Sequence, residues 1–548
     1  MARLTLPRPL PRAGAPEPER VVDRNGRPAR APDRGAGGEP DVDGSVRADA
    51  GAAADASADA QAGRYVLYLM ERAQRAHGNA ALEEAAARAN ALRLPLLVAW
   101  ASNPGAAEWT PRRAEFALEG MRETRDDLAR RGVPLLAIAL APEDAAFVLG
   151  RGAATIVVDR GYLREDRRWR GAAAAAASQA FIEVEGDTVV PVEVASPSAE
   201  AGARTLRGKL ERQVERFLNP VAEVTLARRW DDRAMRSEVP AGIAWADLDD
   251  ARSAERMVAH GTVAHGTVAH GTVAAGMVAR GASEPTETPF LPGAVPTYFT
   301  GGQREARRRL QRFVEHELPG YGEVRGRPAA DRVSRLSPYL RFGQISPVEV
   351  ALAVLAAVQD APRLEDDART FLEELIVRRE LALNHVWYRE DYDRYETLPA
   401  WARATLAEHA SDPRSPAYDE ATLETGATHD PYWNAAMREM RVTGYLHNHM
   451  RMYWGKQILA WSPDPKQAFA RARDLNDRYF LDGHAPNGYA GVAWSFGLHD
   501  RPWPERPVFG KVRSMTVGGL ERKADPRAYV ARVAALGVGQ DERDILPR

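Results

Sequence analysis

The sequence predicts two folded regions, a doubly wound parallel α/β domain followed by an all-α domain. In the first region, short and continuous apolar runs alternate with helical patterns, at residues 65–70, 95–100, 134–140 and 154–159. Runs of this kind are typical of strands that are buried on both faces of a parallel sheet. From residue 303 to the end the patterns are helical, and no strand alternation of any length intervenes. Repeated β-α-β units followed by helices alone define the fold class.

Helices are expected wherever apolar residues recur with a helical period. Between the strands, the expected helices cover 79–92 and 110–131, and Thr110 with Pro111 supplies an N-cap and a first-turn proline. In the second region, the clearest helical segments are 304–317, 346–358, 369–388, 432–461 and 465–479. A doubly wound sheet binds ligands beyond the carboxyl ends of its strands, and we expect any ligand of the first domain there.

The composition limits the classes of protein that fit. The chain has 548 residues, of which 45% are hydrophobic and 27% charged, and it contains no apolar run near the roughly 18 residues that span a bilayer. Lys+Arg 74 against Asp+Glu 76 gives a formal net charge of -2, so a nucleic-acid partner must bind a local basic face. Cys 0 excludes disulfides, thiolate nucleophiles, zinc ribbons and cysteine-held iron–sulfur clusters. We expect a cytoplasmic protein without a metal site.

Composition also places the domain boundaries. Residues 1–63 contain no aromatic residue, which predicts a disordered arm because little apolar surface could be buried. The expected order is then the α/β domain over 64–200, a linker over 201–302, the helical domain over 303–530 and a tail over 531–548. Inside the linker, a five-residue HGTVA repeat over 257–279 holds His260, His265 and His270. These histidines could bind a metal, but a five-residue period matches neither helix nor strand and favours a slipped-repeat insertion.

Common nucleotide and hydrolase signatures are absent, and candidate chemistry lies in three weaker segments. The first reads SRLSPYLRFGQIS over 334–346, where Ser334 and Ser337 precede a proline-started turn. Two hydroxyls in this setting suit a phosphate or a polyol chain, and they equally suit an N-cap followed by a loop. In the second segment, a helix over 371–381, Glu374 and Arg378 stand one turn apart. This spacing alone indicates a solvated salt bridge.

The third segment, residues 444–461, is an apolar helix with polar interruptions. Trp454 and Trp461 lie two turns apart on one face, and an aromatic stripe of this kind is usually core. Arg451 lies in the same helix, and a buried arginine requires an anionic partner. Asp482, in the loop LDGHAPNGY, is the candidate partner.

Taken together, these segments resemble the DNA photolyase and cryptochrome family over roughly residues 64–530. The matching motifs are SRLSPYL, the ELIxR helix, the AAMRxM-x3-GYLHNxxRM stretch over 435–452 and the DG loop at Asp482. Within the family, the wording is similar to class II cyclobutane pyrimidine dimer photolyases, in RMYWxKxILxW, HDPxWNAA, LDGxxPNGYxGxAWS, HDRPWxERPxFGK and TVVPVEVAS. The resemblance implies an N-terminal α/β antenna domain and a C-terminal helical FAD domain.

The resemblance also implies the cofactor and the residues that bind it. FAD would be the cofactor, active in its reduced form, with Arg451 and Asp482 beside the isoalloxazine ring and Asn476 near its reactive central nitrogen. The implied FAD-binding residues are Tyr321, Ser334, Arg335, Leu336, Ser337, Glu374, Arg378, Arg451, Asn476, Asp482 and Asn487. The family also uses an antenna chromophore in the first domain, a folate or a deazaflavin, or none, and no motif discriminates between these.

The implied substrate is a cyclobutane pyrimidine dimer in DNA, flipped out of the duplex and split by an electron from excited reduced FAD. Glu374 would hydrogen-bond the dimer and Trp494 would stack on it. The implied substrate-binding residues are Arg335, Glu374, Asn448, Trp494, Asp500 and Trp503, and the implied catalytic residues are Glu374, Asn476, Trp433, Trp454 and Trp461. The three tryptophans would carry electrons to resting flavin. Class I proteins differ, with an aliphatic residue at Trp433 and a tryptophan at Val377.

Two basic clusters favour DNA binding, and they also fit a solvated surface. The first cluster lies on one helix and consists of Arg304, Arg307, Arg308, Arg309 and Arg312. The second consists of Arg501, which is part of the HDRPW motif, and of Arg506, Lys511 and Arg513, which follow that motif. Contacts of this kind with phosphate set affinity and salt dependence. We therefore expect a monomeric, light-driven DNA repair lyase. The alternative is a cryptochrome-like flavin photosensor that signals through a protein partner.

Overall fold

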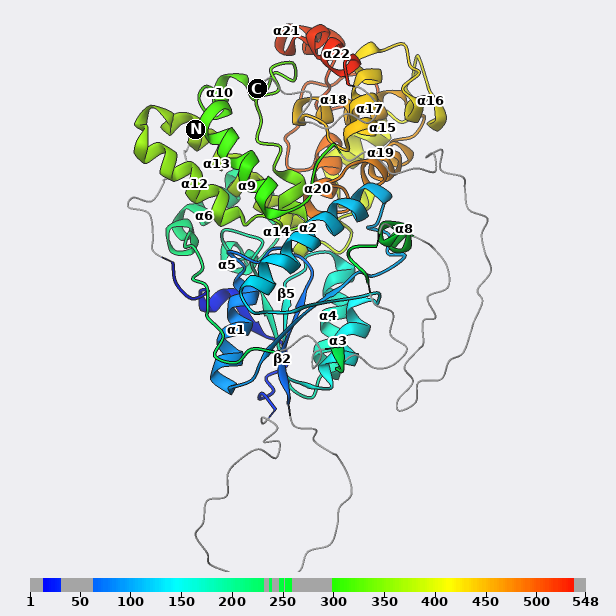
Figure 1. The fold of residues 1–548 in the computed structure, drawn as a ribbon. Coiled ribbons are helices and arrows are strands. Elements are labelled where there is room, and N and C mark those ends of the chain that lie inside the picture. Colours follow the sequence, from blue (N-terminus) through cyan, green and yellow to red (C-terminus); the bar gives the residue numbers. More distant parts are fainter. Residues whose placement is uncertain are drawn as a thin grey trace, which may run out of the picture.

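The computed structural model describes residues 13–30, 63–230, 236–238, 246–250, 252–258 and 298–536. A sheet flanked by helices lies at one end of the molecule, and a larger group of helices lies at the other end (Figure 1). The chain enters the sheet first and then builds the helical half, as the sequence predicts. The HGTVA repeat, apart from its first two residues, and residues 537–548 of the tail lie outside the described residues.

The sheet has six strands in the order β1-β6-β5-β2-β3-β4. Its strands are β1 (Val21–Asp23), β2 (Tyr65–Met70), β3 (Leu96–Ala101), β4 (Leu135–Ile138), β5 (Ala153–Asp159) and β6 (Ala180–Val184). Every pair is parallel except β1 with β6. Residues of β2, β3, β5 and β6 are buried throughout, because helices cover both faces of the sheet. The predicted doubly wound fold is confirmed.

The edge strand β1 corrects one prediction. Residues 1–63 were expected to be disordered, but the part over 13–30 is folded against the sheet, where Val21 pairs with Val184. Its main anchor is Arg20, which is 3% exposed. The guanidinium of Arg20 donates to the carbonyl oxygens of Glu185, Thr188, Val189 and Phe217. Composition missed this segment because its stability comes from backbone pairing and one buried cation, and not from aromatic burial.

The helices of this half are α1 (Ala80–Leu92), α2 (Pro111–Arg130), α3 (Pro142–Gly150), α4 (Arg164–Ala176), α5 (Val192–Ala195), α6 (Ala203–Phe217) and α8 (Ser253–Val258). The sequence predicts the first two, over 79–92 and 110–131, and did not predict the others. Asn79 caps α1 by accepting from the Leu82 N–H at 3.0 Å, and the predicted N-cap Thr110 accepts from Arg113 N–H. Helices α6 and α8 lie inside the region that was predicted to be a linker, so that region is partly helical.

The helical half contains the remaining elements. They are α9 (Gln303–Arg312), η2 (Phe313–Glu317), α10 (Tyr321–Val324), α11 (Ser337–Arg341), α12 (Pro347–Asp360), η3 (Pro362–Leu364), α13 (Glu365–Leu372), η4 (Glu373–Arg378), α14 (Arg379–Tyr388), η5 (Tyr395–Thr397), α15 (Ala400–Glu408), α16 (Glu420–Thr425), α17 (Pro431–Thr443), α18 (Asn448–Trp461), α19 (Pro465–Tyr479), α20 (Pro486–Ser495), α21 (Val517–Ala524) and α22 (Pro526–Ala534). Elements η2 and η4 are short π-helices.

Two helix boundaries in this half differ from the predictions. The segment over 432–461 was expected to be one helix, but α17 ends at Thr443 and is capped by Gly444, whose φ of 73° lies in the left-handed region. The helical domain was expected to end at residue 530, but α22 continues to Ala534. Its Tyr529 donates to Glu439 of α17 at 2.7 Å, which fixes α22 to the domain.

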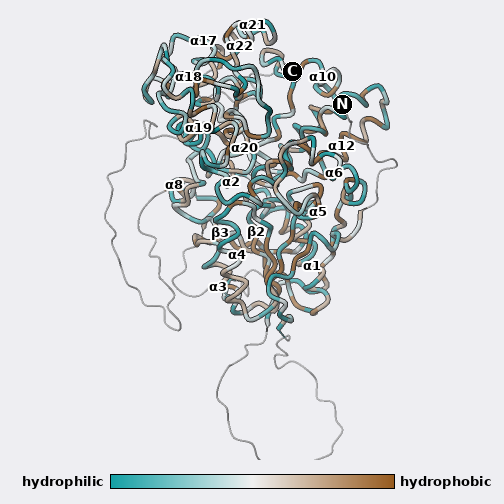
Figure 2. Tube along the Cα trace, turned by 180° about the vertical axis from the view of Figure 1, so that it is seen from behind, coloured by the Kyte–Doolittle hydropathy of each residue, from teal (hydrophilic) through white to brown (hydrophobic). Residues whose placement is uncertain are grey.

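One hydrophobic core runs through both halves of the described chain. It joins Trp100 of the sheet to Phe116 of α2 and to Leu355 of α12. Figure 2 shows the hydrophobic segments gathered along the strands and between the inner helices. Polar contacts also cross the boundary, since Arg112 donates to the carbonyl oxygens of Met440 and Tyr479. None of the helices in the described residues is long and apolar enough to cross a membrane.

Candidate functional site

An ion pair between α18 and the loop after α19 lies in the helical half. Arg451 Nη2 donates to Asp482 Oδ1 at 2.9 Å, and both side chains are largely buried. The guanidinium carbon lies 3.9 Å from the centroid of the Phe480 ring. The sequence prediction that Asp482 is the carboxylate partner of Arg451 is confirmed.

The loop that carries Asp482 wraps around Asn476. The Asn476 side chain is 2% exposed and donates to Asp477 Oδ1 at 2.8 Å. Two glycines allow this approach, because a Cβ at Gly483 would lie 2.6 Å from the Asn476 carbonyl oxygen and one at Gly488 would lie 2.9 Å from its Nδ2. The glycines of the LDGHAPNGY loop therefore serve close packing around Asn476.

The segment before α11 presents two hydroxyl groups. Arg335 adopts a φ of 51°, and its guanidinium contacts Asp331 and lies 2.8 Å from Tyr298 Oη. Leu336 is buried, and Ser334 and Ser337 are half-buried. Within the described chain, neither serine hydroxyl bonds a protein group, so Ser337 does not act as a side-chain cap of α11. The hydroxyls remain available for a phosphate or a polyol, whereas Arg335 is already paired.

His447 supplies a buried donor beside this segment. Its Nδ1 accepts from the His449 N–H at 3.2 Å, and burial lowers its pKa to about 4. The ring is therefore neutral, with its proton on Nε2. That Nε2 is buried and has no hydrogen-bond partner within the described residues. Buried donors are nearly always paired, so an acceptor atom of a ligand fits here. His447 lies in the GYLHNxxRM motif, but the sequence analysis gave it no role.

A second group surrounds Glu374 on the π-helix η4. The Glu374 carboxylate pairs with Arg325 at 2.8 Å and not with Arg378, which corrects the predicted one-turn salt bridge. A π-helix rotates residues away from the usual i,i+4 contact, and Arg378 instead lies 3.5 Å from Glu373. Tyr321 lies beside the pair, and burial raises its pKa to about 12.

Trp494 of α20 faces the same group. The guanidinium of Arg378 lies 5.3 Å from the centroid of the half-buried Trp494 ring. This is a cation–π contact. Farther along the chain, Asp500 accepts from Trp503 Nε1 at 3.3 Å. The two other predicted side chains, Asn448 at the start of α18 and Asn487 on α20, are exposed.

Three tryptophans form a continuous stack in the helical half. The rings of Trp433 and Trp454 are parallel, with an interplanar angle of 1° and centroids 6.0 Å apart. The ring of Trp461 meets that of Trp433 edge-on, with centroids 5.4 Å apart and an interplanar angle of 76°. Phe480 lies 6.0 Å from Trp454 and so connects the stack to Arg451. The order Trp454, Trp433, Trp461 is the one that the resemblance implies.

Local capping explains why Trp433 holds its place. In the HDPYWNAA motif, Asp430 is the N-cap of α17 and accepts from the Tyr432 and Trp433 N–H groups at 2.9 and 3.2 Å. Pro431 follows at the first helical position. Asp430 also accepts from the Tyr453 hydroxyl of α18, so one buried carboxylate joins the two tryptophan-bearing helices.

The two predicted basic clusters have different surroundings. We call Arg304, Arg307, Arg308, Arg309 and Arg312 the α9 cluster, and Arg501, Arg506, Lys511 and Arg513 the Trp503 cluster. Every member of the α9 cluster pairs with a carboxylate, at 2.5 to 2.9 Å. Members of the Trp503 cluster are exposed and have no carboxylate partner among the described residues. The structure therefore corrects the prediction for the α9 cluster, which is not a free basic face.

The carboxyl end of the sheet is filled largely by internal contacts. Asp159, at the end of β5, accepts from the N–H groups of Glu71, Arg72 and Ala73 at 2.8 to 3.1 Å. Its other oxygen accepts from the Tyr68 hydroxyl at 2.8 Å. These bonds close the space between β2 and β5, where the strand order reverses.

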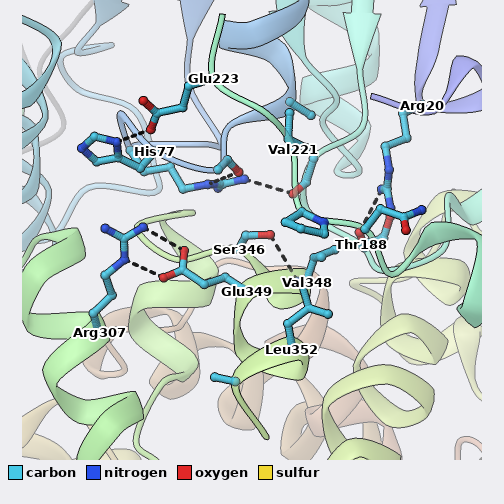
Figure 3. Close-up of a pocket in the computed structure, with 17 residues that line it drawn as sticks. Arg20, His77, Thr188, Val221, Glu223, Arg307, Ser346, Val348, Glu349 and Leu352 are labelled. Atoms are coloured by element: carbon cyan, nitrogen blue, oxygen red, sulfur yellow. Dashed lines mark hydrogen bonds and ion pairs between the residues drawn. The ribbon is translucent and has the colours of Figure 1, made fainter. Parts of the chain in front are cut away.

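A pocket of about 430 Å³ lies beyond the carboxyl ends of β2 and β6 and is closed on the far side by α12. Two polar pairs face each other across it, the hydrogen-bonded His77 and Glu223 and the ion pair of Arg307 with Glu349 (Figure 3). Apolar groups such as Leu352 fill most of the wall. The pocket has the position expected for a ligand of the first domain, and its volume is within the range of small-molecule sites.

No group of His, Asp or Glu side chains within the described residues could hold a metal ion. The histidines His260, His265 and His270 of the repeat lie outside those residues.

The chain is similar to known proteins over most of its length. The family model described as DNA photolyase matches residues 66–226. A deoxyribodipyrimidine photo-lyase of Methanothermobacter thermautotrophicus is 38% identical over 475 residues, covering 86% of this chain and 95% of the relative. Proteins of the same name from Oryza sativa and Potorous tridactylus are 37% and 33% identical, covering 87% and 85% of this chain and 89% and 81% of the relatives.

Two solved structures share the fold. A bacterial class III photolyase from Agrobacterium tumefaciens has a TM-score of 0.57 and 16% identity, with 88% of each chain covered. A cryptochrome from Synechocystis has a TM-score of 0.59 and 16% identity, with 86% of this chain and 88% of the other covered. Both confirm the arrangement of an α/β domain followed by a helical domain.

Proposed function

The chain belongs to the DNA photolyase family, and on that premise we propose that it repairs cyclobutane pyrimidine dimers in DNA with light and bound FAD. The observation that carries the proposal is the stack of Trp454, Trp433 and Trp461, which begins at Phe480 beside the Arg451–Asp482 pair. These buried tryptophan rings are easily oxidised. Their arrangement suits the delivery of electrons to a redox cofactor bound beside the Arg451–Asp482 pair.

The residues around the proposed flavin site fit such a cofactor. Ser334 and Ser337 offer hydroxyls to phosphates or to a ribityl chain, and His447 Nε2 offers a buried N–H. The guanidinium of Arg451 would place a positive charge beside the ring system, and the Asn476 side chain would place an amide there. Bound in its reduced form, FAD would supply the light-driven electron that splits the dimer.

Glu374 and the side chains around it form the proposed wall of the substrate site. Trp494 is half-buried and presents a ring on which a flipped base can stack, a contact worth about 1 to 3 kcal/mol per base. The Glu374 carboxylate can accept the imide N–H of a pyrimidine, and its partner Arg325 places positive charge where the dimer gains an electron. Tyr321 and Arg378 lie beside Glu374 and Trp494, and Asn448 is proposed as a further substrate-binding residue on the family resemblance alone.

The decisive experiment measures repair directly. We expect purified protein to show flavin absorbance and, with reductant and blue light, to restore thymine absorbance in dimer-containing oligothymidine. Glu374→Gln is expected to lower the repair yield by roughly 10-fold or more, because it removes the charge from a hydrogen bond to the dimer. Trp494→Ala should weaken dimer binding. Glu420→Gln, an exposed carboxylate on α16, is the matched control. Flavin bands without any light-dependent repair would contradict the proposal.

The tryptophan stack can be tested apart from repair. Trp433 is fully buried between Trp454 and Trp461. Trp433→Phe is therefore expected to abolish light-driven reduction of the resting flavin, while protein that is reduced chemically beforehand still repairs dimers. Trp401→Phe, which lies outside the stack, should leave both readouts unchanged. Equal photoreduction in Trp433→Phe and the unmodified protein would remove the stack from the mechanism.

We assign the chain to class II on its motif wording, on Trp433 and on Val377, and we propose that it acts as a monomer in the cytoplasm. The second candidate function is a flavin photosensor, which the shared fold with a cryptochrome favours. A protein partner captured only after illumination, without repair, would establish that alternative.

A further inference from the structure

The aromatic stack does not end at Trp461. The ring of Tyr418 lies 5.3 Å from that of Trp461, at an interplanar angle of 85°. The Tyr418 N–H also donates to the Trp461 carbonyl oxygen at 3.4 Å, so backbone and ring contacts hold the same two residues together. Successive centroids from Trp454 to Tyr418 are thus 6.0, 5.4 and 5.3 Å apart. The tyrosine is as close to the stack as the tryptophans are to one another.

The hydroxyl of Tyr418 has a defined hydrogen-bond direction. Its oxygen accepts from the His429 backbone N–H at 3.0 Å and lies 2.7 Å from His429 Nδ1. When the imidazole is neutral and Nδ1 carries a lone pair, the phenol proton is donated to that nitrogen. The proton acceptor is therefore in place before any electron leaves the ring.

Exposure changes along the same path. Trp433 and Trp454 are 0% and 2% exposed, Tyr418 is half-buried, and His429 is exposed. The His429 ring also lies 5.6 Å from Trp461. A proton received at Nδ1 can thus leave to water from Nε2. Tyr453 offers no such exit, because its hydroxyl bonds Asp430, which is buried.

We propose that Tyr418 is the terminal electron donor of the stack and that His429 accepts its proton. The inference rests on the proposed function, in which light drives reduction of the resting flavin; the light-excited flavin would be the oxidant that draws electrons through the stack. One electron passes from Tyr418 to the Trp461 radical cation, which returns to neutral tryptophan. The phenol O–H bond breaks in the same step, its proton binds His429 Nδ1, and a neutral tyrosyl radical and an imidazolium result.

Loss of the proton from Tyr418 slows recombination of the separated charges. A neutral tyrosyl radical can regain its electron only if a proton comes back with it. The radical would also lie at the surface, where a soluble reductant reaches it. Tyr418 would therefore extend the life of the separated charge beyond that of a stack ending at Trp461.

The first test identifies the radical. Flavin-loaded protein is illuminated and examined by electron paramagnetic resonance and transient absorption, with Tyr418→Phe compared to the unmodified chain. We expect a tyrosyl signal that disappears in Tyr418→Phe, where a tryptophan radical remains and recombines at least 10-fold faster. Tyr395→Phe is the matched control, because Tyr395 is half-buried and packs on Phe469 instead of a tryptophan. Identical radicals and decay in Tyr418→Phe and the unmodified protein would overturn the proposal.

The second test addresses the proton. His429→Ala should slow formation of the tyrosyl radical, and added imidazole should restore it, because the position is open to solvent. The unmodified protein should form the radical more slowly in D₂O than in H₂O. A rate that neither the substitution nor D₂O changes would remove His429 from the step.

A third measurement separates this inference from the proposed function. An added ruthenium trisbipyridine photo-oxidant can oxidise the rings of protein that carries no flavin. A tyrosyl signal that is smaller in both Tyr418→Phe and Trp461→Phe than in Tyr395→Phe would support the path even if the protein proved to bind no flavin. A signal unaffected by Tyr418→Phe would overturn the path, whatever the outcome of the repair assay.

Discussion

The α9 cluster and the Trp503 cluster are both rich in cations, and their surroundings give them opposite roles. In the α9 cluster each guanidinium meets a carboxylate, and Arg309 is 6% exposed, with its guanidinium 4.7 Å from the Phe299 ring centroid. In the Trp503 cluster, Arg501 and Arg513 lie 5.3 and 4.8 Å from the Trp503 ring centroid and meet no carboxylate within the described chain. The first cluster holds helices together, and the second presents unneutralised charge.

The difference teaches that counting cations does not locate a phosphate-binding surface. Part of the neutralisation is visible in sequence, because Glu305 lies three and four residues from Arg308 and Arg309. The rest is tertiary, since Arg304 pairs with Asp127 of α2 and Arg307 with Glu349 of α12. A carboxylate that arrives from another element cannot be read from the helix on which the arginine lies.

The largest expected effect concerns stability. Arg309→Met would leave the largely buried Glu305 paired with Arg308 alone. It would also remove the cation that lies over the Phe299 and Tyr339 rings. We expect it to lower the free energy of unfolding by about 2 to 3 kcal/mol. The matched variant Arg513→Met removes an exposed cation and should leave the melting temperature nearly unchanged. Comparable melting temperatures for the two variants would show that the two clusters do not differ in structural role.

The next effect concerns DNA affinity. Arg501→Ala combined with Arg513→Ala should weaken binding to duplex DNA on the order of 10-fold and reduce the slope of log Kobs against log salt by about 0.9 for each lost phosphate contact. Arg307→Ala combined with Arg308→Ala serves as the control, because both arginines are already neutralised. Binding measured by fluorescence anisotropy over a salt series checks this. An equal loss in both double variants would contradict the comparison.

The fold was largely predictable, and its exceptions have physical reasons. Buried parallel strands produce continuous apolar runs, which is why the region over 64–200 could be read directly. Strand β1 was missed because Val21 and Val22 gain their place from pairing with β6 and from the buried Arg20, and neither produces a periodic pattern. The break at Gly444 was missed because apolar and aromatic residues continue on both sides of it.

A contact of the site was predictable where the chemistry of one residue requires a particular partner. Contacts that depend on how separate elements pack were missed. The Arg451–Asp482 pair followed from the need of a buried cation for a carboxylate. The partner of Glu374 did not, because the π-helix η4 changes which side chains share a face. His447 Nε2 and the contact of Phe480 with Trp454 depend on how α18 and the loop after α19 meet.

The smallest expected effect lies beneath the Trp503 cluster. Lys456 is 1% exposed and donates to the Ser495 carbonyl oxygen. Burial, opposed by Asp500 and assisted by Arg513, lowers its pKa to about 7. Above pH 7 the folded chain has released this proton, while the unfolded chain keeps it up to the ordinary lysine range. The unfolded state then binds more protons, so this group makes stability rise with pH over that window.

The Lys456 contribution should amount to about 1 kcal/mol between pH 7 and pH 8. Lys456→Met is expected to remove it, which unfolding free energies at the two pH values would show. Lys466→Met, on the exposed start of α19, is the control and should leave the pH dependence unchanged. DNA bound over the Trp503 cluster would bring phosphates close to Lys456 and favour its charged form, so binding should be accompanied by proton uptake near pH 7. Binding without proton uptake would place the phosphates away from this cluster.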